Sequence, residues 1–517
     1  MEFFPLNSLP PDHFLSQPRP DSSNPTFPGV VDTTTLAAHD FDVDNRSGFM
    51  PPQEPLGRLP AQWEAWEEVL DAAISDRLQL GEKADQGVQE REKSLRWRSR
   101  VREVSFFSPL PSRLTTGTIT INHYQLPILT TTELKRSEVV LRRSHIVLAW
   151  IMHFYIRTIP PGEPIRIPPS VTIPLLQVSN HLQLPPVLTY SDDVLYNWKS
   201  KSSSSPGLGV PDLQDLQCHT LFTGTKDEEE FYLSSARIEL RGVDALSLMR
   251  STMDELFVGD EIAVKRITTY LTRLATVIND LTGLLMAIRD GCNPEVFYHE
   301  IRPWFKGADS DGEPWVFEGL DREEAEGLEV PAELSGPSAG QSSLIHALDI
   351  FLGVHEYSHS STITGDESLS SSASASASTS SSSPPPTNAK KSFLDRMRLY
   401  MPRHHRNFLS HLGSSQRPLR QFVINNAGAG QEGSALMDAY NQAIVALKEF
   451  RDKHIVIVTL YIIGPARRAT QRSTETEGGE EVQQGKEELK GTGGTNLARF
   501  LKDVRDGTKG ATLDRAI

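Results

Sequence analysis

The sequence has too little cysteine for a disulfide-stabilised fold. Its 517 residues include two cysteines, Cys218 and Cys292, which cannot make a disulfide framework. The first residues, MEFFPLNSLPPDHF, lack the basic start and the apolar run of a signal peptide. We therefore expect a cytoplasmic protein.

Positive charge is also scarce. Lysine and arginine number 52 against 67 aspartates and glutamates, the net charge is −15, and no basic cluster is interleaved with aromatic residues. Nucleic acid and anionic membrane surfaces are therefore not expected as partners. The expected partner is a small molecule or a protein. The most apolar segments, around residues 145–156 and 454–463, are too short to span a bilayer and are edged by charges, so no transmembrane helix is expected.

Several common catalytic motifs are missing. Paired CxxC, Walker A and GxGxxG after a strand do not occur, so zinc-finger, P-loop and Rossmann classes have no local support. Two glycine-rich strings remain, SGPSAGQSS at 335–343 and KGTGGT at 490–495, and each is either a turn or a loop that brings backbone amides to a ligand. Adjacent His404 and His405 face different directions on a helix, so we interpret them as surface or capping groups rather than a metal site.

Composition divides the chain into several regions. Residues 1–35 are rich in Pro, Ser and Asn and are predicted to be a disordered arm. Residues 36–222 read as a small mixed α domain with a few short strands, and residues 223–517 as a larger all-α domain. Within the latter, a Ser-rich stretch at 358–390 is predicted to be disordered and a charged stretch at 467–490 to be a mobile loop. The expected fold class is mainly α.

Helical periodicity is clearest at residues 264–290, where apolar residues recur at steps of three and four before GCNP. Further helices are expected at 62–80 and 137–157. The same spacing runs through LKEFRDKHIVIVTLYIIGP at 447–465, and Gly-Pro is expected to end that helix.

His454 lies on the apolar stripe of this last helix, so its imidazole is expected to point inward. A buried imidazole needs a partner for each ring nitrogen, which can be a backbone carbonyl, a carboxylate or a metal. The stretch alone leaves a core histidine and a metal ligand both open.

Six strings in a fixed order carry a family resemblance. They are IPPSVTIPLLQVSNHLQLPPVLTYSDDVLYNWK, NPEVFYHEIRPW, SGPSAGQSS, FLDRMRLYMPRHHRNFL, RDKHIVIVTLYI and KGTGGTNLARFLK. Together they closely resemble the indoleamine 2,3-dioxygenase family of haem enzymes, over roughly residues 40–510 without the Ser-rich insert. That insert and the long N-terminal arm are more similar to fungal than to vertebrate members. The resemblance implies an all-α domain that binds haem and a smaller domain that caps its distal side.

The resemblance implies haem b as cofactor and His454 as its proximal iron ligand. A neutral proximal imidazole leaves the opposite side of ferrous iron open for O₂. Its second ring nitrogen needs an acceptor, which the sequence does not identify. Arg451 matches the family's arginine near a haem propionate, and Asp349 matches an aspartate close to that arginine. From the residues alone, both could lie on a helix surface.

On the distal side the resemblance implies a pocket for an amino acid. Phe297 would pack on the indole and Arg302 would pair with the substrate carboxylate. Because they are five residues apart, their side chains would be offset by about 140° on a continuous helix. Without the resemblance, Phe297 would be interpreted as a core residue and Arg302 as part of a solvent-exposed ion pair. Tyr190 and Phe231 match pocket positions, and Ser235 matches a position that tunes distal hydrogen bonding.

Two loops complete the implied site. Ser338 and Ala339 match a loop that passes over the haem, where small residues leave room for substrate and O₂. Thr492 matches a mobile loop residue that closes on bound substrate, which suits its place after a charged stretch.

Some positions depart from the vertebrate pattern of the family. Asp193 stands where a cysteine lines the inner pocket, Tyr232 and Tyr298 stand for phenylalanines, and Pro337 replaces a glycine beside the haem loop. These residues make the pocket edge more polar. They put substrate preference in doubt more than haem binding.

The implied reaction is cleavage of the indole C2–C3 bond of L-tryptophan by O₂ to give N-formylkynurenine, the first step of the kynurenine pathway. An electron donor would keep the haem ferrous, and the protein is expected to be a monomer. Two alternatives stay open. One is a haem paralogue with weak tryptophan activity or another indole substrate, and the other is a non-catalytic haem or indole sensor.

Overall fold

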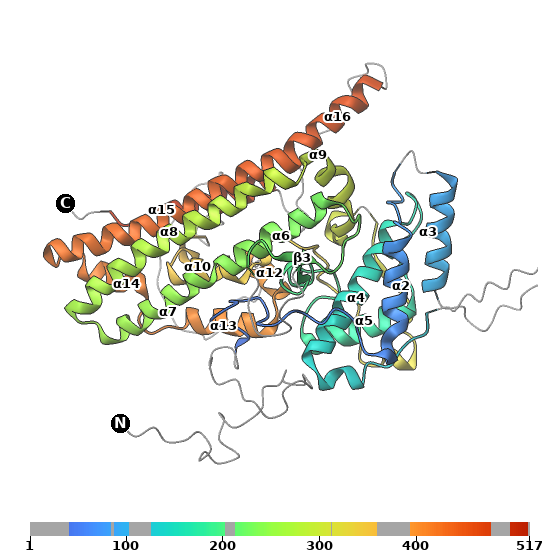
Figure 1. Cartoon of the computed structure of the whole chain (residues 1–517), viewed down its shortest axis with the longest axis horizontal. Helices are drawn as coiled ribbons and strands as arrows, with labels where there is room; N and C mark the ends of the chain where they lie inside the picture. The colour runs from blue at the N-terminus through green and yellow to red at the C-terminus, as the bar shows by residue number, and fades with distance from the viewer. Residues whose placement is uncertain are drawn as a thin grey trace, which may run out of the picture.

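The computed structural model describes residues 41–83, 87–102, 126–201, 212–311, 313–358, 393–476 and 497–514. Within these ranges the chain is mainly helical with two pairs of short strands, which confirms the predicted fold class (Figure 1). The arm at 1–35 lies outside the described residues. So does the Ser-rich insert, apart from Ser358, which ends helix α11.

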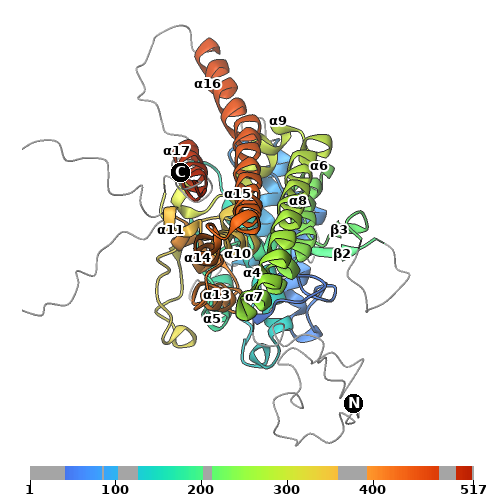
Figure 2. The ribbon, with the colours of Figure 1, turned by 90° about the vertical axis from the view of Figure 1, so that its left-hand side faces the viewer.

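Two long helices form the spine of the larger, C-terminal part. Helix α8 (Glu261–Gly291) and helix α15 (Gly430–Val458) run alongside each other, as the two views in Figures 1 and 2 show. Helix α8 begins where Asp260 accepts a hydrogen bond from the Ala263 amide, and one apolar face of it is buried, as the 264–290 periodicity predicted. Helices α6 (Lys226–Arg241) and α7 (Val243–Val258) pack against α8.

Shorter helices complete this part of the molecule. They are α9 (Pro294–Val296), α10 (Ser343–Phe351), α11 (His355–Ser358), α12 (Phe393–Met397), α13 (Arg403–Gly413), α14 (Leu419–Asn426), α16 (Gly464–Thr476) and α17 (Leu497–Gly510). Helices α14 and α17 pack against α15, and α10 packs against α13.

The N-terminal part is built around helix α4 (Glu138–Arg157), which is capped by Ser137, whose hydroxyl accepts a hydrogen bond from the Val140 amide, and is largely buried. Helices α2 (Glu64–Ser75) and α5 (Pro169–Leu182) pack on α4, and α3 (Val88–Val101) packs on α2. Helix α2 is shorter at both ends than the predicted span 62–80.

Two short strand pairs accompany these helices. Strand β2 (Trp198–Ser200) pairs antiparallel with β3 (Leu216–Cys218), and β1 (Arg166–Ile167) pairs parallel with β4 (Val316–Phe317). Strand β4 belongs to the region predicted to be all-α, so packing crosses the predicted division at residue 222. That division stays a prediction.

The long C-terminal helix does not end at Gly464-Pro465, so that prediction was wrong. A π-helical turn, Thr459–Ile463, leads directly into α16. Pro465 occupies the first turn of α16, where a missing N–H removes no helical hydrogen bond. Residues 467–476 of the predicted mobile loop are therefore helical, and residues 477–490 lie outside the described part of the chain.

His404 and His405 were both predicted to be surface or capping groups, and this prediction is wrong for His405. His404 is half-buried and contacts Glu138 at 3.5 Å, as a surface group would. His405 is completely buried and packs edge-on against Phe49, and burial lowers its pKa to about 3. The first turn of α13 thus turns His405 into the core.

Two described helices, α4 and α8, are long and apolar enough to cross a membrane by length and composition. The sequence-based prediction considered too short a part of α4. In the fold, 83% of the apolar window of α4 and 44% of that of α8 are buried inside the protein. Burial of α4 is typical of the core helix of a globular protein.

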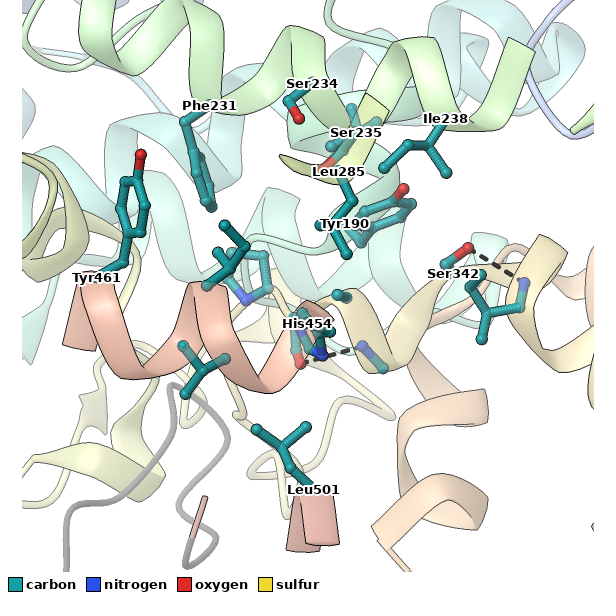
Figure 3. A pocket seen from close by; sticks show the side chains of 18 of the residues that line it. Tyr190, Phe231, Ser234, Ser235, Ile238, Leu285, Ser342, His454, Tyr461 and Leu501 are labelled. Atoms are coloured by element: carbon teal, nitrogen blue, oxygen red, sulfur yellow. Dashed lines mark hydrogen bonds between the residues drawn. The ribbon is translucent and has the colours of Figure 1, made fainter. Parts of the chain in front are cut away.

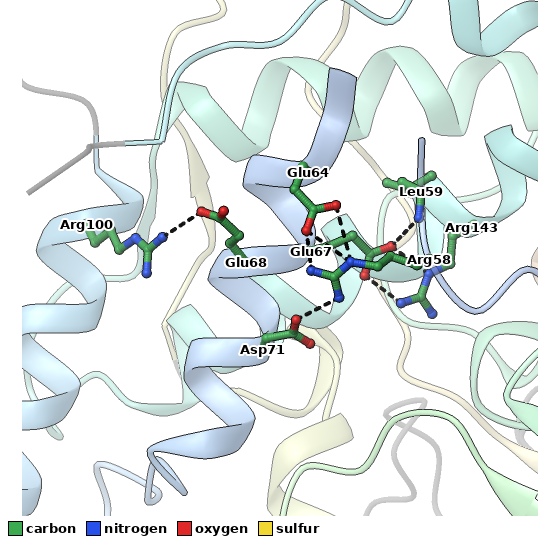
Figure 4. A network of polar contacts seen from close by, with 8 residues as sticks. All are labelled: Arg58, Leu59, Glu64, Glu67, Glu68, Asp71, Arg100 and Arg143. Carbon is green, nitrogen blue, oxygen red and sulfur yellow. Dashed lines mark hydrogen bonds and ion pairs between the residues drawn. The ribbon is translucent and has the colours of Figure 1, made fainter. Parts of the chain in front are cut away.

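A buried ion pair joins α2 to α4 (Figure 4). Arg143 donates from Nε and Nη2 to the two carboxylate oxygens of Glu67, at 2.9 and 2.6 Å, and the Leu59 amide donates to Oε1 of Glu67 at 2.8 Å. Arg100 and Glu68 form an exposed pair nearby at 3.3 Å. Only the first pair is shielded from water.

We expect Glu67→Leu to destabilise the protein by about 3–5 kcal/mol, because it leaves the Arg143 guanidinium buried without its carboxylate. Glu68→Leu is the matched control and should cost less than about 1 kcal/mol, since its pair with Arg100 is exposed. Urea unfolding of the two variants measures both values. Equal losses would contradict a structural role for the buried pair.

Candidate functional site

One cavity brings together distant parts of the chain. It lies between α6, α15, α17 and the loop before α10, and it offers about 270 Å³ to the centres of water-sized molecules. Ten of the predicted site residues line it, namely Tyr190, Phe231, Ser235, Phe297, Arg302, Ser338, Ala339, Asp349, Arg451 and His454. The eleventh, Thr492, lies outside the described residues.

The backbone at this cavity is irregular in a consistent way. Three π-helical turns occur in the described residues, at Ser191–Leu195, Phe297–Ile301 and Thr459–Ile463, and each contributes residues to the cavity lining. Such turns are rare and often lie at functional sites.

The turn at Phe297 corrects one geometric expectation. The Arg302 amide donates to the Phe297 carbonyl, a bond between residues five apart, so this segment is not the continuous α-helix that the 140° offset assumed. Both side chains therefore reach the same cavity.

His454 lies on the α15 wall of the cavity, facing the residues of α6 in Figure 3. It is half-buried, so it lines a space rather than packing in the core. Burial and the positive charge of Arg451 lower the pKa of His454 to about 4, which keeps the imidazole neutral at pH 7. The imidazole makes no hydrogen bond to the other described residues, so a ring nitrogen is available to a ligand.

Arg451 and Asp349 form a buried ion pair beside His454. Nη2 of Arg451 lies 2.5 and 2.6 Å from the two oxygens of Asp349, and Nη1 donates to the hydroxyl of Thr508. The predicted closeness of Arg451 and Asp349 is confirmed. Because the three side chains come from α15, α10 and α17, the pair also joins these helices.

Aromatic rings from α6, the turn Phe297–Ile301 and the turn that follows α15 line a second part of the cavity. The ring centroids of Phe231 and Phe297 are 4.6 Å apart, Phe231 stacks on Phe305 at 5.8 Å, and Tyr461 meets Phe297 edge-on at 5.7 Å. Rings in such arrangements form a firm apolar wall. A flat aromatic ligand would find complementary faces there.

Arg302 adds a positive charge to this apolar wall. Arg302 is 8% exposed, and its guanidinium lies 5.7 Å from the centroid of the Tyr298 ring. Burial lowers the pKa of Arg302 from its usual value, but an arginine stays charged at neutral pH. A buried guanidinium lining a cavity favours an anionic ligand group.

The loop over the cavity is held in place by hydrogen bonds. Ser338 accepts from the Gly340 amide at 3.2 Å, and Nε2 of His346 donates to the Gly340 carbonyl at 2.9 Å. The Tyr190 amide donates to the side-chain oxygen of Gln341 at 2.8 Å. Ala339 is exposed at the cavity edge, so the small residue leaves that edge open.

A buried acid that the sequence analysis missed connects two walls. Glu239 accepts hydrogen bonds from the hydroxyls of Tyr190, at 2.9 Å, and Ser342, at 2.6 Å. Burial raises the pKa of Glu239 to about 7. Helical spacing could have indicated it, because Glu239 follows Ser235 by four residues on α6. In the same way, His346 follows Ser342 by four residues, which is the spacing of neighbours on one helix face.

The chain was compared with known proteins. The sequence model of the indoleamine 2,3-dioxygenase family matches residues 37–511. Indoleamine 2,3-dioxygenase of Saccharomyces cerevisiae is 36% identical, with 72% of this chain and 78% of the yeast protein covered. Indoleamine 2,3-dioxygenase 1 of Rattus norvegicus is 30% identical, with 78% and 87% covered. A 6-hydroxytryptophan 2,3-dioxygenase of Fusarium equiseti is 27% identical, with 90% and 95% covered.

These matches agree with the cavity. The segments that the resemblance assigned to a site are the ones that meet around His454, although they lie far apart in the sequence. The matches confirm the predicted enzyme class, an oxidoreductase of the dioxygenase type. The chain therefore belongs to the indoleamine 2,3-dioxygenase family.

Proposed function

We propose that this protein is a haem-dependent dioxygenase that cleaves the indole 2,3-bond of L-tryptophan with O₂ to give N-formylkynurenine. The observation that carries the proposal is one cavity with two unlike walls. A neutral imidazole without a partner in the described residues, His454, lies on one wall. Aromatic rings and the Arg302 guanidinium lie on the other.

The residues around His454 fit a haem. An iron held by His454 would take its further ligands from the macrocycle of a haem. Apolar residues of α15 and α8 line the space beside it, including Ile457, Val458 and Leu285. Arg451 has five N–H donors, which leaves capacity for a propionate beyond Asp349 and Thr508.

Each wall then has a defined task. Bound haem supplies the activation of O₂. His454 holds the iron as a neutral imidazole. Phe231 and Phe297 orient the indole by ring contacts, and Arg302 pairs with the substrate carboxylate as a bidentate donor.

The cavity also controls water and position. Its wall is mostly apolar, so a bound indole displaces water from the reacting bond. Tyr190, which bonds to Glu239, and Ser235 stand on the α6 side and give this wall a fixed hydrogen-bonding edge. A substrate held at both its carboxylate and its ring has few orientations left, which favours reaction at one bond.

The wider setting belongs to the same proposal. N-formylkynurenine formation would open tryptophan catabolism by the kynurenine pathway and supply a precursor of NAD. The protein would act as a cytoplasmic monomer, with a separate electron donor keeping the haem ferrous. Thr492 would close over bound substrate.

His454→Ala should abolish haem retention and N-formylkynurenine formation, because the variant removes the iron's protein ligand. Haem content per chain and the absorbance spectrum of the reconstituted protein measure the first effect, and product formation from L-tryptophan under air with a reductant measures the second. His299→Ala is the control, since His299 is exposed and does not line the cavity. Full haem retention by His454→Ala would contradict the assignment.

Arg302→Ala should raise the KM for L-tryptophan about 10- to 100-fold, because a charged hydrogen-bonded pair contributes about 1.5–3 kcal/mol. The haem spectrum should not change. Tryptamine, which lacks the carboxylate, provides the matched comparison, and its KM should be nearly the same in both proteins. A parallel loss for tryptophan and tryptamine would show that Arg302 shapes the cavity without binding the carboxylate.

A further inference from the structure

Asp193 is a buried acid in the cavity wall with an unused oxygen. It lies in the π-helical turn Ser191–Leu195, is 3% exposed and lines the cavity. Its Oδ1 has no hydrogen-bond partner among the described residues. Asp192, its neighbour, is by contrast fully engaged with His145 and Thr189.

A buried carboxyl without a partner destabilises a fold, because it has lost its hydrogen bonds to water and makes no hydrogen bond within the protein. Burial and the negative charges of Asp192 and Glu228 raise the pKa of Asp193 well above its usual value. Burial therefore favours the neutral form of this acid, which can both donate and accept a hydrogen bond. Such a group calls for a reason beyond folding.

Tyr232 gives the same part of the cavity a second polar group. It is 1% exposed and lines the cavity, and its one hydrogen bond to a described side chain is a long one of 3.4 Å, to Glu228. Tyr232 lies on α6 and the turn that carries Asp193 packs on α6, so both groups belong to the α6 side of the cavity.

This polar pair is separate from the carboxylate site. Asp193 lies in the turn Ser191–Leu195 and Tyr232 on α6, whereas Arg302 directly follows the turn Phe297–Ile301. The two polar groups therefore enter the cavity from different elements. If Arg302 takes the carboxylate, the ring end of the substrate is left for Asp193 and Tyr232.

We propose that Asp193 and Tyr232 form a polar subsite that binds a hydroxyl group on the benzene ring of the indole, so that the enzyme prefers hydroxylated tryptophan to its methylated isostere. The inference rests on the proposed function, since it assumes a tryptophan-like ligand oriented by Arg302. An unsubstituted ring leaves Asp193 unpaired. A hydroxyl both donates and accepts, which completes its bonding.

The test uses the haem-reconstituted full chain and L-tryptophan, its 5- and 6-hydroxy forms and its 5- and 6-methyl forms. Values of kcat/KM and binding constants from calorimetry are measured for each. The native protein should favour at least one hydroxy form over the corresponding methyl form by about tenfold, as a buried hydrogen bond allows. Asp193→Leu, an apolar residue of similar shape, should remove or reverse that ratio.

Two further variants make the result specific. Asp193→Asn keeps a donor and an acceptor, so it should keep a hydroxy preference even if the leucine variant folds poorly. Val194→Ala enlarges the same part of the cavity without changing its polarity, so it should alter hydroxy and methyl forms alike.

The outcomes separate this subsite from the reaction itself. A hydroxy-to-methyl ratio that is the same in the native protein and Asp193→Leu, with tryptophan still cleaved, overturns the subsite and leaves the proposed function standing. Calorimetric preference for a hydroxy form that disappears in Asp193→Leu supports the subsite even if no substrate is cleaved. In that case the proposed reaction fails alone.

Discussion

The buried ion pair between Arg451 and Asp349 fixes the wall on which His454 lies. It joins α15 to α10, and through Thr508 it also joins α17. With both carboxylate oxygens within 2.6 Å of one nitrogen, the pair sets the rotation of α15 about its axis. His454 is one turn further along that helix, so its direction into the cavity follows from the same contact. Removing either partner would leave a buried charge, which makes the arrangement hard to relax.

Irregular backbone positions the rest of the site. A regular helix repeats every 3.6 residues, and so it would turn Phe297 and Arg302 to different sides. The π-helical turn brings both to the cavity, and similar turns carry Asp193 and Tyr461 to it. The long helices supply rigidity, and the inserted turns direct particular side chains. The fold can therefore hold a shaped site inside a largely regular helical frame.

The helical frame could be predicted from the sequence, because apolar spacing reports which face of a helix is buried. The inward direction of His454 followed from that spacing, and its place at a cavity needed the family resemblance. What could not be predicted depends on backbone shifts or on contacts between distant segments. Nothing in NPEVFYHEIRPW distinguishes a π-helical turn from an α-helix. Gly464-Pro465 reads as a helix end, although helical structure continues through it. Helical spacing could place Glu239 near Ser235, but not its hydrogen bonds, because its partners lie about 50 and 100 residues away along the chain.

Two acids on the α6 side of the cavity show how a site and a fold make different demands. Oε1 of the buried Glu239 accepts hydrogen bonds from Tyr190 and Ser342, which tie α6 to the loop before α10, while its Oε2 has no partner among the described residues. Asp193 is equally buried, and its Oδ1 has no hydrogen-bond partner among those residues either. The first acid therefore contributes rigidity in the free protein. The second contributes no hydrogen bond until a ligand supplies its partner. Its burial therefore weakens the fold, but it also lets the site distinguish ligands that can bond to Asp193 from ligands that cannot.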